Sequence, residues 1–156
     1  MRTAKNGATL GPESETSPVG VKRLGTGFDP AALLAEARAK NTAVHLKENE
    51  DVFLQGEQAD TVFYIQKGQI RLTVVTQNGK EATIALLGAG DFIGEECITP
   101  DHPTRMATAT ALTECTLLKV DRKEILRVLH EEPAFSGLFV SYLLARSTQL
   151  EADLIE

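Results

Sequence analysis

The feature that most limits the fold of this chain is a series of short segments between residues 42 and 120 that are apolar or alternate apolar with polar residues. Glycine, asparagine or charged residues that favour turns close most of these segments. The predicted strands are 43–47, 51–54, 62–65, 69–76, 81–87, 106–112 and 115–120. Many short strands separated by turns are typical of an antiparallel barrel or sandwich, so we predict a mainly β domain with flanking helices.

Two of the connections are predicted to be hairpins. The sequence Gln-Asn-Gly-Lys at 77–80 favours a type I′ turn, because Asn-Gly tolerates the positive φ values of that turn. The dipeptide at 113–114 predicts a second hairpin, which would pair the two strands on either side of it. The strand before this hairpin carries small side chains on one face, which suits either a ligand or plain sheet packing: Ala107, Ala109 and Ala111.

Composition excludes several classes of protein. The 156 residues are 42% hydrophobic and 24% charged, which predicts one globular, soluble domain with a real core. The net charge of −6 argues against nucleic-acid binding by this chain alone, because phosphate contact needs a basic surface. Two cysteines, Cys97 and Cys115, are too few for a disulfide scaffold, and Cys115 is predicted to be a buried small side chain. No apolar run approaches ~20 residues and no secretory signal is recognisable, so we expect a cytoplasmic protein without membrane contact.

The two ends of the chain differ from its centre. Residues 1–27 are rich in glycine, serine, threonine, proline and charge, and are predicted to be a disordered tail. Asp29 and Pro30 then predict the N-cap and first position of a short helix that ends near Lys40. Asp121 predicts the start of a second helix over 122–130, and Glu124 three residues later strengthens that signal.

Pro133 predicts the start of a last helix, which runs to residue 156. Apolar residues recur along it at spacings of four and seven, which indicates a contact between two helices and predicts a homodimer. Packing within one chain is the alternative reading. The residues predicted to form the dimer interface are Phe139, Leu143, Leu150 and Leu154.

One stretch, residues 94–108, carries the chemistry from which a binding site can be predicted. Gly94 and Glu95 follow a strand-like run, and Arg105 comes ten residues after Glu95, beyond a segment with two prolines. A carboxylate can accept a hydrogen bond from a sugar hydroxyl, and the guanidinium fork of an arginine can hold a phosphate with two parallel hydrogen bonds. The stretch therefore favours recognition of a ligand that contains both a sugar and a phosphate.

These residues resemble the phosphate-binding cassette of cyclic-nucleotide-binding domains in regulators of the Crp/Fnr family. The family pattern Phe-x-Gly-Glu followed by Arg-x-Ala is matched by Phe92, Gly94, Glu95, Arg105 and Ala107. The resemblance implies that Glu95 takes the ribose 2′-hydroxyl and Arg105 the cyclic phosphate, with Gly94, Met106 and Ala107 completing the site. Two positions depart from the pattern. Glu96 replaces an aliphatic residue, and Met106 stands where many ligand-binding members have serine or alanine.

The resemblance covers roughly residues 28–156 and implies both fold and function. Residues 28–132 would form a jelly roll (a double-stranded β-helix), and residues 133–156 would begin the long dimerisation helix. The implied function is the ligand-sensing and dimerisation domain of a Crp/Fnr-like transcriptional regulator. No cofactor is predicted; cAMP or cGMP is the implied effector. DNA contact would need a domain that is absent from this chain, so we expect a sensor half cut from a longer regulator or a stand-alone sensor.

Two other functions remain open from the sequence, and a third, an enzyme, is disfavoured. The cassette could be degenerate, which would leave a structural dimerisation module, or the domain could regulate a kinase or a channel. An enzyme on a cupin-type barrel would need clustered metal ligands, whereas His45, His102 and His130 fall on separate predicted elements. We therefore predict that the chain is not an enzyme.

The base end of the predicted site is not visible in the sequence. The family's best-known cAMP sensors use a Thr-Ser pair on the long helix, and the equivalent positions here are Leu150 and Glu151. Leucine offers no hydrogen bond, and burying the charge of Glu151 would be costly. The nearest neutral polar residues lie slightly earlier, at Ser147, Thr148 and Gln149. The expected behaviour is weak, poorly selective binding of cAMP and cGMP, or activation by another effector.

Overall fold

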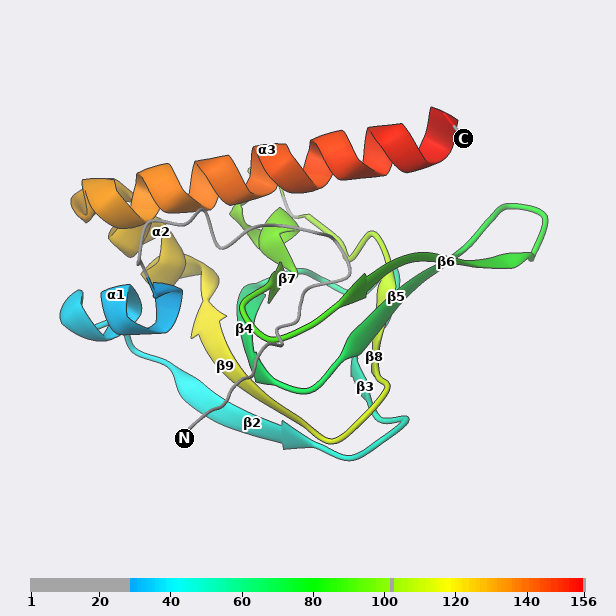
Figure 1. Cartoon of the computed structure of the whole chain (residues 1–156), viewed down its shortest axis with the longest axis horizontal. Helices are drawn as coiled ribbons and strands as arrows, with labels where there is room; N and C mark the ends of the chain where they lie inside the picture. Colours follow the sequence, from blue (N-terminus) through cyan, green and yellow to red (C-terminus); the bar gives the residue numbers. More distant parts are fainter. Residues whose placement is uncertain (1–28, 102, 156) are drawn as a thin grey trace, which may run out of the picture.

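The computed structural model describes residues 29–101 and 103–155, and side-chain positions within the last helix as far as Arg146. Two four-stranded antiparallel sheets face one another, and the described residues also form three α-helices, which pack on the outside of the sheets, and one 3₁₀ helix (Figure 1). The strands are β2 (Thr42–Leu46), β3 (Asp51–Phe53), β4 (Thr61–Lys67), β5 (Ile70–Val75), β6 (Glu81–Leu87), β7 (Phe92–Ile93), β8 (Thr108–Ala111) and β9 (Cys115–Asp121). The helices are α1 (Pro30–Glu36), the short 3₁₀ helix η2 (Glu95–Ile98), α2 (Arg122–Glu131) and α3 (Pro133–Ile155). The mainly β architecture predicted from the sequence is confirmed.

The chain passes repeatedly from one sheet to the other. One sheet has the order β2-β9-β4-β7 and the other has the order β3-β8-β5-β6. The predicted pairing of β5 with β6 is confirmed, but the predicted hairpin between β8 and β9 is wrong. β8 pairs with β3 and β5, while β9 crosses to the opposite sheet and pairs with β2 and β4. The dipeptide at 113–114 thus connects the two sheets at an edge of the barrel.

The turn between β5 and β6 also differs from its prediction. Of its residues only Gly79 has a positive φ, of 79°, and Asn78 does not. The Gly79 N–H donates to the carbonyl of Thr76, and the Thr76 N–H donates to the carbonyl of Lys80. This is a three-residue loop with glycine in the left-handed position, which is a common alternative to the two-residue type I′ turn.

Two apolar clusters explain why β4 is a continuous apolar run. Phe63 and Ile65 point into the space between the sheets, whereas Val62 and Tyr64 point outward beneath the helices. Ala109 and Ala111 are fully buried in the cluster between the sheets, so plain packing accounts for them. Cys115 belongs to the same cluster, as predicted, and both cysteines are buried and unpaired.

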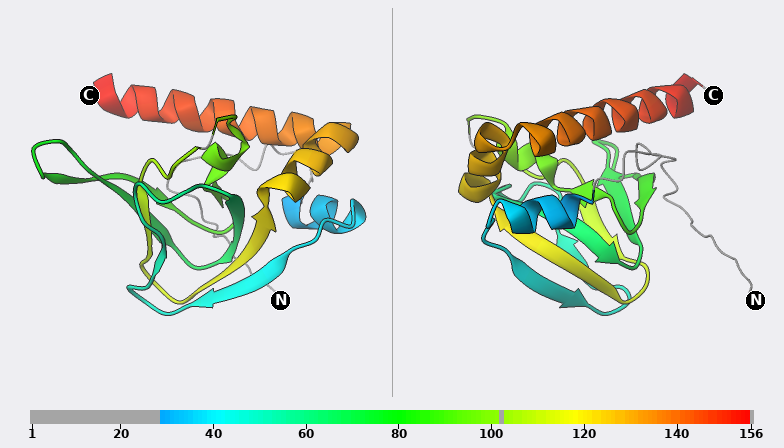
Figure 2. Two further views of the ribbon diagram at one scale, coloured as in Figure 1. Left: turned by 180° about the vertical axis from the view of Figure 1, so that it is seen from behind. Right: turned by 60° about the vertical axis from the view of Figure 1, so that its left-hand side comes forward.

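The long helix α3 lies along one side of the barrel (Figure 2). Aromatic side chains hold it there. Phe92 lies at the centre of this contact, with ring centroids 5.1 Å from Phe139, 5.7 Å from Tyr142 and 6.2 Å from Phe135. Phe139 is only 2% exposed. It is therefore a core residue of this chain, which corrects its assignment to an interface between two chains.

The positions at which α1 and α2 start were predicted correctly, but only α1 has the predicted side-chain cap. The Asp29 carboxylate accepts a hydrogen bond from the Ala31 N–H at 3.0 Å, and Pro30 begins α1. Asp121 stands at the start of α2 but makes no capping bond with its side chain. Glu124 does not cap α2 but joins it to the segment that follows α1. Its carboxylate accepts from the Lys40 N–H at 2.8 Å and from Arg127 at 2.7 Å.

Some expectations fall outside the described part of the chain. They concern the tail at 1–27, His102, and the side chains of Ser147, Thr148, Gln149, Leu150, Glu151 and Leu154. Across the residues that are described, no helix is both long enough and apolar enough to cross a membrane.

The contacts of Glu124 predict a specific pH dependence of stability. Hydrogen bonds from Arg127 and from the Lys40 N–H lower the pKa of Glu124 to about 2, against about 4.3 in an unfolded chain. The stabilisation by these bonds is therefore complete at a pH above the pKa of Glu124 in the unfolded chain. It is lost as the pH falls through the pKa of Glu124 in the folded chain. Glu124→Gln should lower the unfolding free energy at pH 7, and the difference from the parent should shrink as the pH falls below about 4 and vanish below about 2. Urea unfolding at several pH values measures this, with Glu48→Gln in an exposed turn as control. A difference that is independent of pH would contradict the assignment.

Candidate functional site

Gly94 connects β7 to η2 and sets the shape of the predicted cassette. Its backbone lies in the left-handed region with φ of 80° and ψ of 19°, which glycine adopts without strain. A Cβ atom at this position would lie 2.6 Å from Nη1 of Arg105. Two features therefore require glycine at position 94: the left-handed backbone conformation and the close approach of the Arg105 guanidinium.

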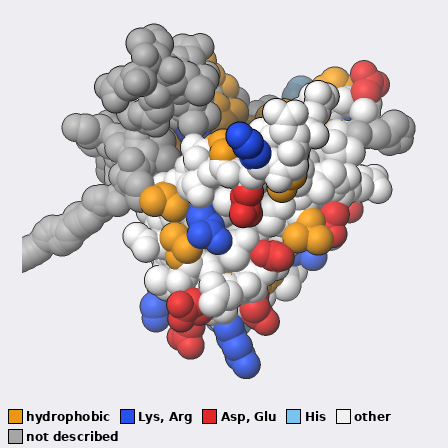
Figure 3. Space-filling view, turned by 90° about the vertical axis from the view of Figure 1, so that its right-hand side faces the viewer, with side chains coloured by type: hydrophobic (Ala, Val, Ile, Leu, Met, Phe, Trp, Pro, Cys, Tyr) orange, Lys and Arg blue, Asp and Glu red, His pale blue; other side chains and the backbone are white. Residues whose placement is uncertain are grey.

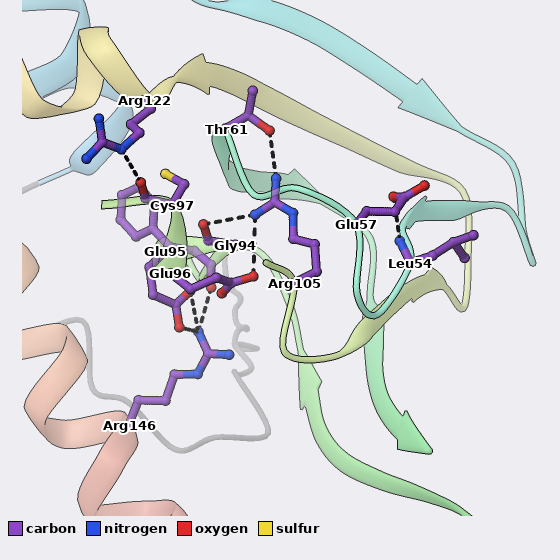
Figure 4. A network of polar contacts seen from close by, with 11 residues as sticks. Leu54, Glu57, Thr61, Gly94, Glu95, Glu96, Cys97, Arg105, Arg122 and Arg146 are labelled. Atoms are coloured by element: carbon purple, nitrogen blue, oxygen red, sulfur yellow. Dashed lines mark hydrogen bonds and ion pairs between the residues drawn. The ribbon is translucent and has the colours of Figure 1, made fainter. Parts of the chain in front are cut away.

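Arg105 is buried, with 4% of its surface exposed, and its guanidinium is held from several sides (Figure 4). Nη1 donates to the Gly94 carbonyl at 3.1 Å, and Nη2 donates to the Thr61 hydroxyl at 2.9 Å. The guanidinium carbon lies 4.2 Å from the ring centroid of Phe53, a distance typical of a cation–π contact. Nε of Arg105 is buried and has no hydrogen-bond partner among the described residues.

The backbone of Arg105 is fixed as firmly as its side chain. Its N–H donates to the carbonyl of Glu57 at 2.7 Å, and its carbonyl accepts from the N–H of Gly56 at 2.9 Å. The segment between β3 and β4 therefore fixes the position of the Arg105 backbone, which precedes β8.

Glu95 is paired with an arginine from α3. Nη1 of Arg146 lies 3.3 Å from Oε1 and 3.2 Å from Oε2 of Glu95, and it also donates to the Phe92 carbonyl at 2.8 Å. Burial raises the pKa of Glu95, although the neighbouring Arg146 acts in the opposite direction. This ion pair connects the cassette directly to the long helix.

Tyr142 strengthens the same connection from one turn earlier on α3. Its hydroxyl donates to the Phe92 carbonyl at 3.2 Å and accepts from the Phe92 N–H at 3.0 Å. Burial raises the pKa of this phenol, so Tyr142 remains a neutral donor at physiological pH. The backbone of β7 is thus bonded to side chains of α3.

A cavity of about 320 Å³ opens between the cassette and α3. Its lining from the described residues combines cassette, sheet and helix: Phe53, Leu72, Ile84, Gly94, Glu95, Glu96, Met106, Ala107, Leu143 and Arg146. Four of the five residues predicted to bind ligand therefore line one space. The fifth, Arg105, lies behind this lining and reaches Gly94 and Glu96 with its guanidinium.

The two departures from the family pattern have different environments. Met106 is 70% exposed and lines the cavity, where its thioether offers only a weak hydrogen-bond acceptor. The carboxylate of Glu96 lies 3.4 Å from Nη1 of Arg105, and 19% of its side chain is exposed. Glu96 therefore both lines the cavity and contacts the arginine, at a position where the family pattern has an aliphatic residue.

Sequence reasoning missed four contributors to the site: Phe53, Thr61, Tyr142 and Arg146. All are far from the cassette in sequence, so local pattern could not connect them to it. The one usable signal was the spacing of Tyr142 and Arg146, which are four residues apart and therefore share one face of a helix. Leu143, predicted for the dimer interface, is half-buried and lines the cavity.

Comparisons with known proteins show what this chain is similar to. Residues 43–132 match the family model described as the cyclic nucleotide-binding domain. The chain is 29% identical over 115 residues to the cAMP-activated global transcriptional regulator CRP of Salmonella typhimurium, which covers 74% of this chain and 50% of that protein. It is 30% identical over 106 residues to the global nitrogen regulator of a Nostoc species, covering 67% of this chain and 48% of that protein.

Among solved structures, the catabolite activator protein of Thermus thermophilus superposes with a TM-score of 0.69 at 26% identity, over 86% of this chain and 63% of that one. The chain spans about half the length of the curated relatives that it matches.

The close approach at Gly94 leads to a prediction with an internal control. Gly94→Ala would place a methyl group against the Arg105 guanidinium and would also strain the backbone. Gly79→Ala has nearly the same φ, 79°, but meets nothing within 4 Å. Both variants pay a conformational cost of about 1 kcal/mol, and Gly94→Ala should lose at least about 1–2 kcal/mol more. Urea unfolding compares them, and equal losses would show that the contact with Arg105 does not constrain residue 94.

Proposed function

This chain belongs to the cyclic-nucleotide-binding domain family, as found in Crp/Fnr regulators, and from that premise we propose that it senses a cyclic nucleotide in its cassette. The observation that carries the proposal is that the Glu95 carboxylate lines a cavity between the cassette and α3, while the Arg105 guanidinium contacts two further residues of that lining, Gly94 and Glu96. A cyclic nucleotide has a hydroxyl for the first group and an anionic phosphodiester for the second.

Binding would use groups that are already in place. The Arg105 fork would hold the phosphodiester with charge-assisted hydrogen bonds, and its buried Nε–H provides a donor that lacks a partner among the described residues. Phe53 and Thr61 hold the guanidinium before ligand arrives, which reduces the entropic cost of binding. Glu95 would accept a hydrogen bond from the ribose 2′-hydroxyl.

Binding at Glu95 would also act on α3. Arg146 shares the Glu95 carboxylate and is bonded to Phe92 together with Tyr142. A ribose hydroxyl that bonds to this carboxylate would change the strength of its pair with Arg146. We propose that α3 can take a second position, in which the pair of Glu95 with Arg146 is broken. The two positions of α3 would then differ in affinity for ligand, which is the condition for a ligand to shift a conformational equilibrium.

The expected selectivity between bases is low. Among the described residues of α3, Leu143 and Arg146 line the cavity. The equivalents of the family's base-reading pair are Leu150 and Glu151. Leucine cannot distinguish the amino group of adenine from the carbonyl of guanine by a hydrogen bond. We therefore propose that cAMP and cGMP bind with affinities that differ by less than ~100-fold.

A second candidate function is a dimerisation module that binds no nucleotide. It is favoured by one observation: both arginines of the site already have a carboxylate partner within the chain. Thermal stability distinguishes the two functions, since a ligand that binds the native state raises the melting temperature.

Arg105→Lys tests the proposed phosphate contact. Lysine keeps the positive charge but loses the planar fork, so we expect the affinity for cAMP to fall by at least about tenfold. Arg127→Lys on α2 is the matched control and should bind as the parent does, because the Arg127 guanidinium bonds to Glu124, Glu131 and Ala37 and to no residue of the cassette. Calorimetry with cAMP and cGMP at fixed salt measures both affinity and selectivity. Parent-like affinity of Arg105→Lys would exclude Arg105 as the phosphate ligand.

We further propose that α3 mediates a homodimer. The outward side of the described part of this helix exposes Val140 by 50% and Leu144 by 65%, four residues apart. On the face seen in Figure 3, by contrast, hydrophobic side chains occur as separate patches among charged ones. The proposed interface therefore includes Val140 and Leu144 and excludes Phe139, and Leu150 and Leu154 remain predicted interface residues farther along the helix.

Leu144→Glu should give a monomer with an unchanged barrel, because a buried, unpaired carboxylate at a helix contact is costly. Leu86→Glu, an exposed leucine on β6, is the control and should stay dimeric. Light scattering at tens of micromolar protein reports the mass. A parent protein that is monomeric under these conditions would contradict the proposed dimer.

A further inference from the structure

Glu96 lies next to the Arg105 guanidinium, the group to which the proposed function assigns the phosphate. Its side chain lines the cavity, and its carboxylate lies 3.4 Å from Nη1 of Arg105. Figure 4 shows this carboxylate and the Gly94 carbonyl both directed at the same nitrogen. A phosphodiester that enters from the cavity therefore meets Glu96 before it reaches the guanidinium.

The charges of the site are balanced without a ligand. Glu95 pairs with Arg146, and Glu96 pairs with Arg105. A phosphodiester monoanion would add a third negative charge beside two carboxylates, and like charges at such distances oppose binding. The anion gains its counter-ion only if Glu96 gives up the guanidinium.

Glu96 is not what holds Arg105 in place. The bonds of the guanidinium to the Gly94 carbonyl and to Thr61 are shorter, at 3.1 and 2.9 Å, and the ring of Phe53 supports it from one side. Glu96 keeps 19% of its side chain exposed, whereas Arg105 keeps 3%. Glu96 can thus exchange its contact with Arg105 for water, while Arg105 stays where it is.

We propose that the Glu96 carboxylate competes with anionic ligands for the Arg105 guanidinium. Glu96 thereby determines how tightly this cassette binds a negatively charged ligand. The inference rests on the proposed function, since it assumes that Arg105 is the anion-binding group. With Glu96 present, the site binds a phosphodiester weakly, because part of the binding free energy is spent on breaking an existing ion pair. Without its charge, the same site presents a pre-positioned and unpaired guanidinium.

Removal of the charge should therefore strengthen anion binding. Glu96→Gln keeps the shape of the side chain, and Glu96→Leu restores the aliphatic character that the family pattern has at this position. Both should raise the affinity for cAMP by about tenfold. Glu131→Gln is the matched control, because Glu131 also pairs with an arginine, at 2.9 Å from Arg127, but lies on α2. It removes the same unit of charge and should leave the affinity unchanged.

The experiment uses two probes on the purified chain, cAMP by calorimetry and inorganic phosphate by the shift in melting temperature, with circular dichroism to confirm folding. Tighter cAMP binding by both Glu96 variants, but not by Glu131→Gln, supports the inference. Equal cAMP affinity of parent and variants would overturn it and leave cyclic-nucleotide binding intact. If cAMP binds to none of the proteins but phosphate stabilises only the Glu96 variants, the inference holds and the proposed function fails. If neither probe binds to any variant, both are overturned.

Discussion

The buried guanidinium of Arg105 is the constraint on which the rest of the site depends. A cation with 4% exposure needs partners. The Gly94 carbonyl and the Thr61 hydroxyl accept hydrogen bonds from it, and the ring of Phe53 adds a cation–π contact, so three different parts of the chain hold it. Gly94 has to be a glycine for the guanidinium to approach, and β3, β4 and η2 have to meet around it. The two-sheet barrel thus positions one charged group beside a cavity.

A second arginine extends this arrangement from the barrel to α3. Arg146 pairs with Glu95, and Tyr142 bonds both the N–H and the carbonyl of Phe92, whose ring lies within the aromatic cluster that holds the helix. The cassette and the long helix therefore share polar as well as apolar contacts. A change at Glu95 acts on a helix that also exposes Val140 and Leu144, the residues proposed to contact a second chain.

Local pattern predicted most of the fold and only part of the site. The strands from β2 to β6, the N-cap at Asp29 and the start of α3 at Pro133 follow from alternation and turn chemistry that act over a few residues. The pairing of β8 and β9 was predicted wrongly, because alternation shows that a strand exists but not to which sheet it belongs. Gly94, Glu95 and Arg105 were predictable as a motif. Arg146 was not, because its partner lies 51 residues away and only tertiary packing brings the two together.

The central claim is that Arg105 receives the phosphate of a cyclic nucleotide in exchange for Glu96. Nitrogen-15 NMR of the Arg105 Nε–H group tests it most directly, since this buried donor has no partner among the described residues and would gain one from the ligand. The signal can be assigned by its absence from Arg105→Lys. Titration with cAMP should shift the signal saturably, and at a lower concentration in Glu96→Gln than in the parent. An Arg105 signal that stays fixed while cAMP saturates the protein would place the nucleotide elsewhere and contradict the account.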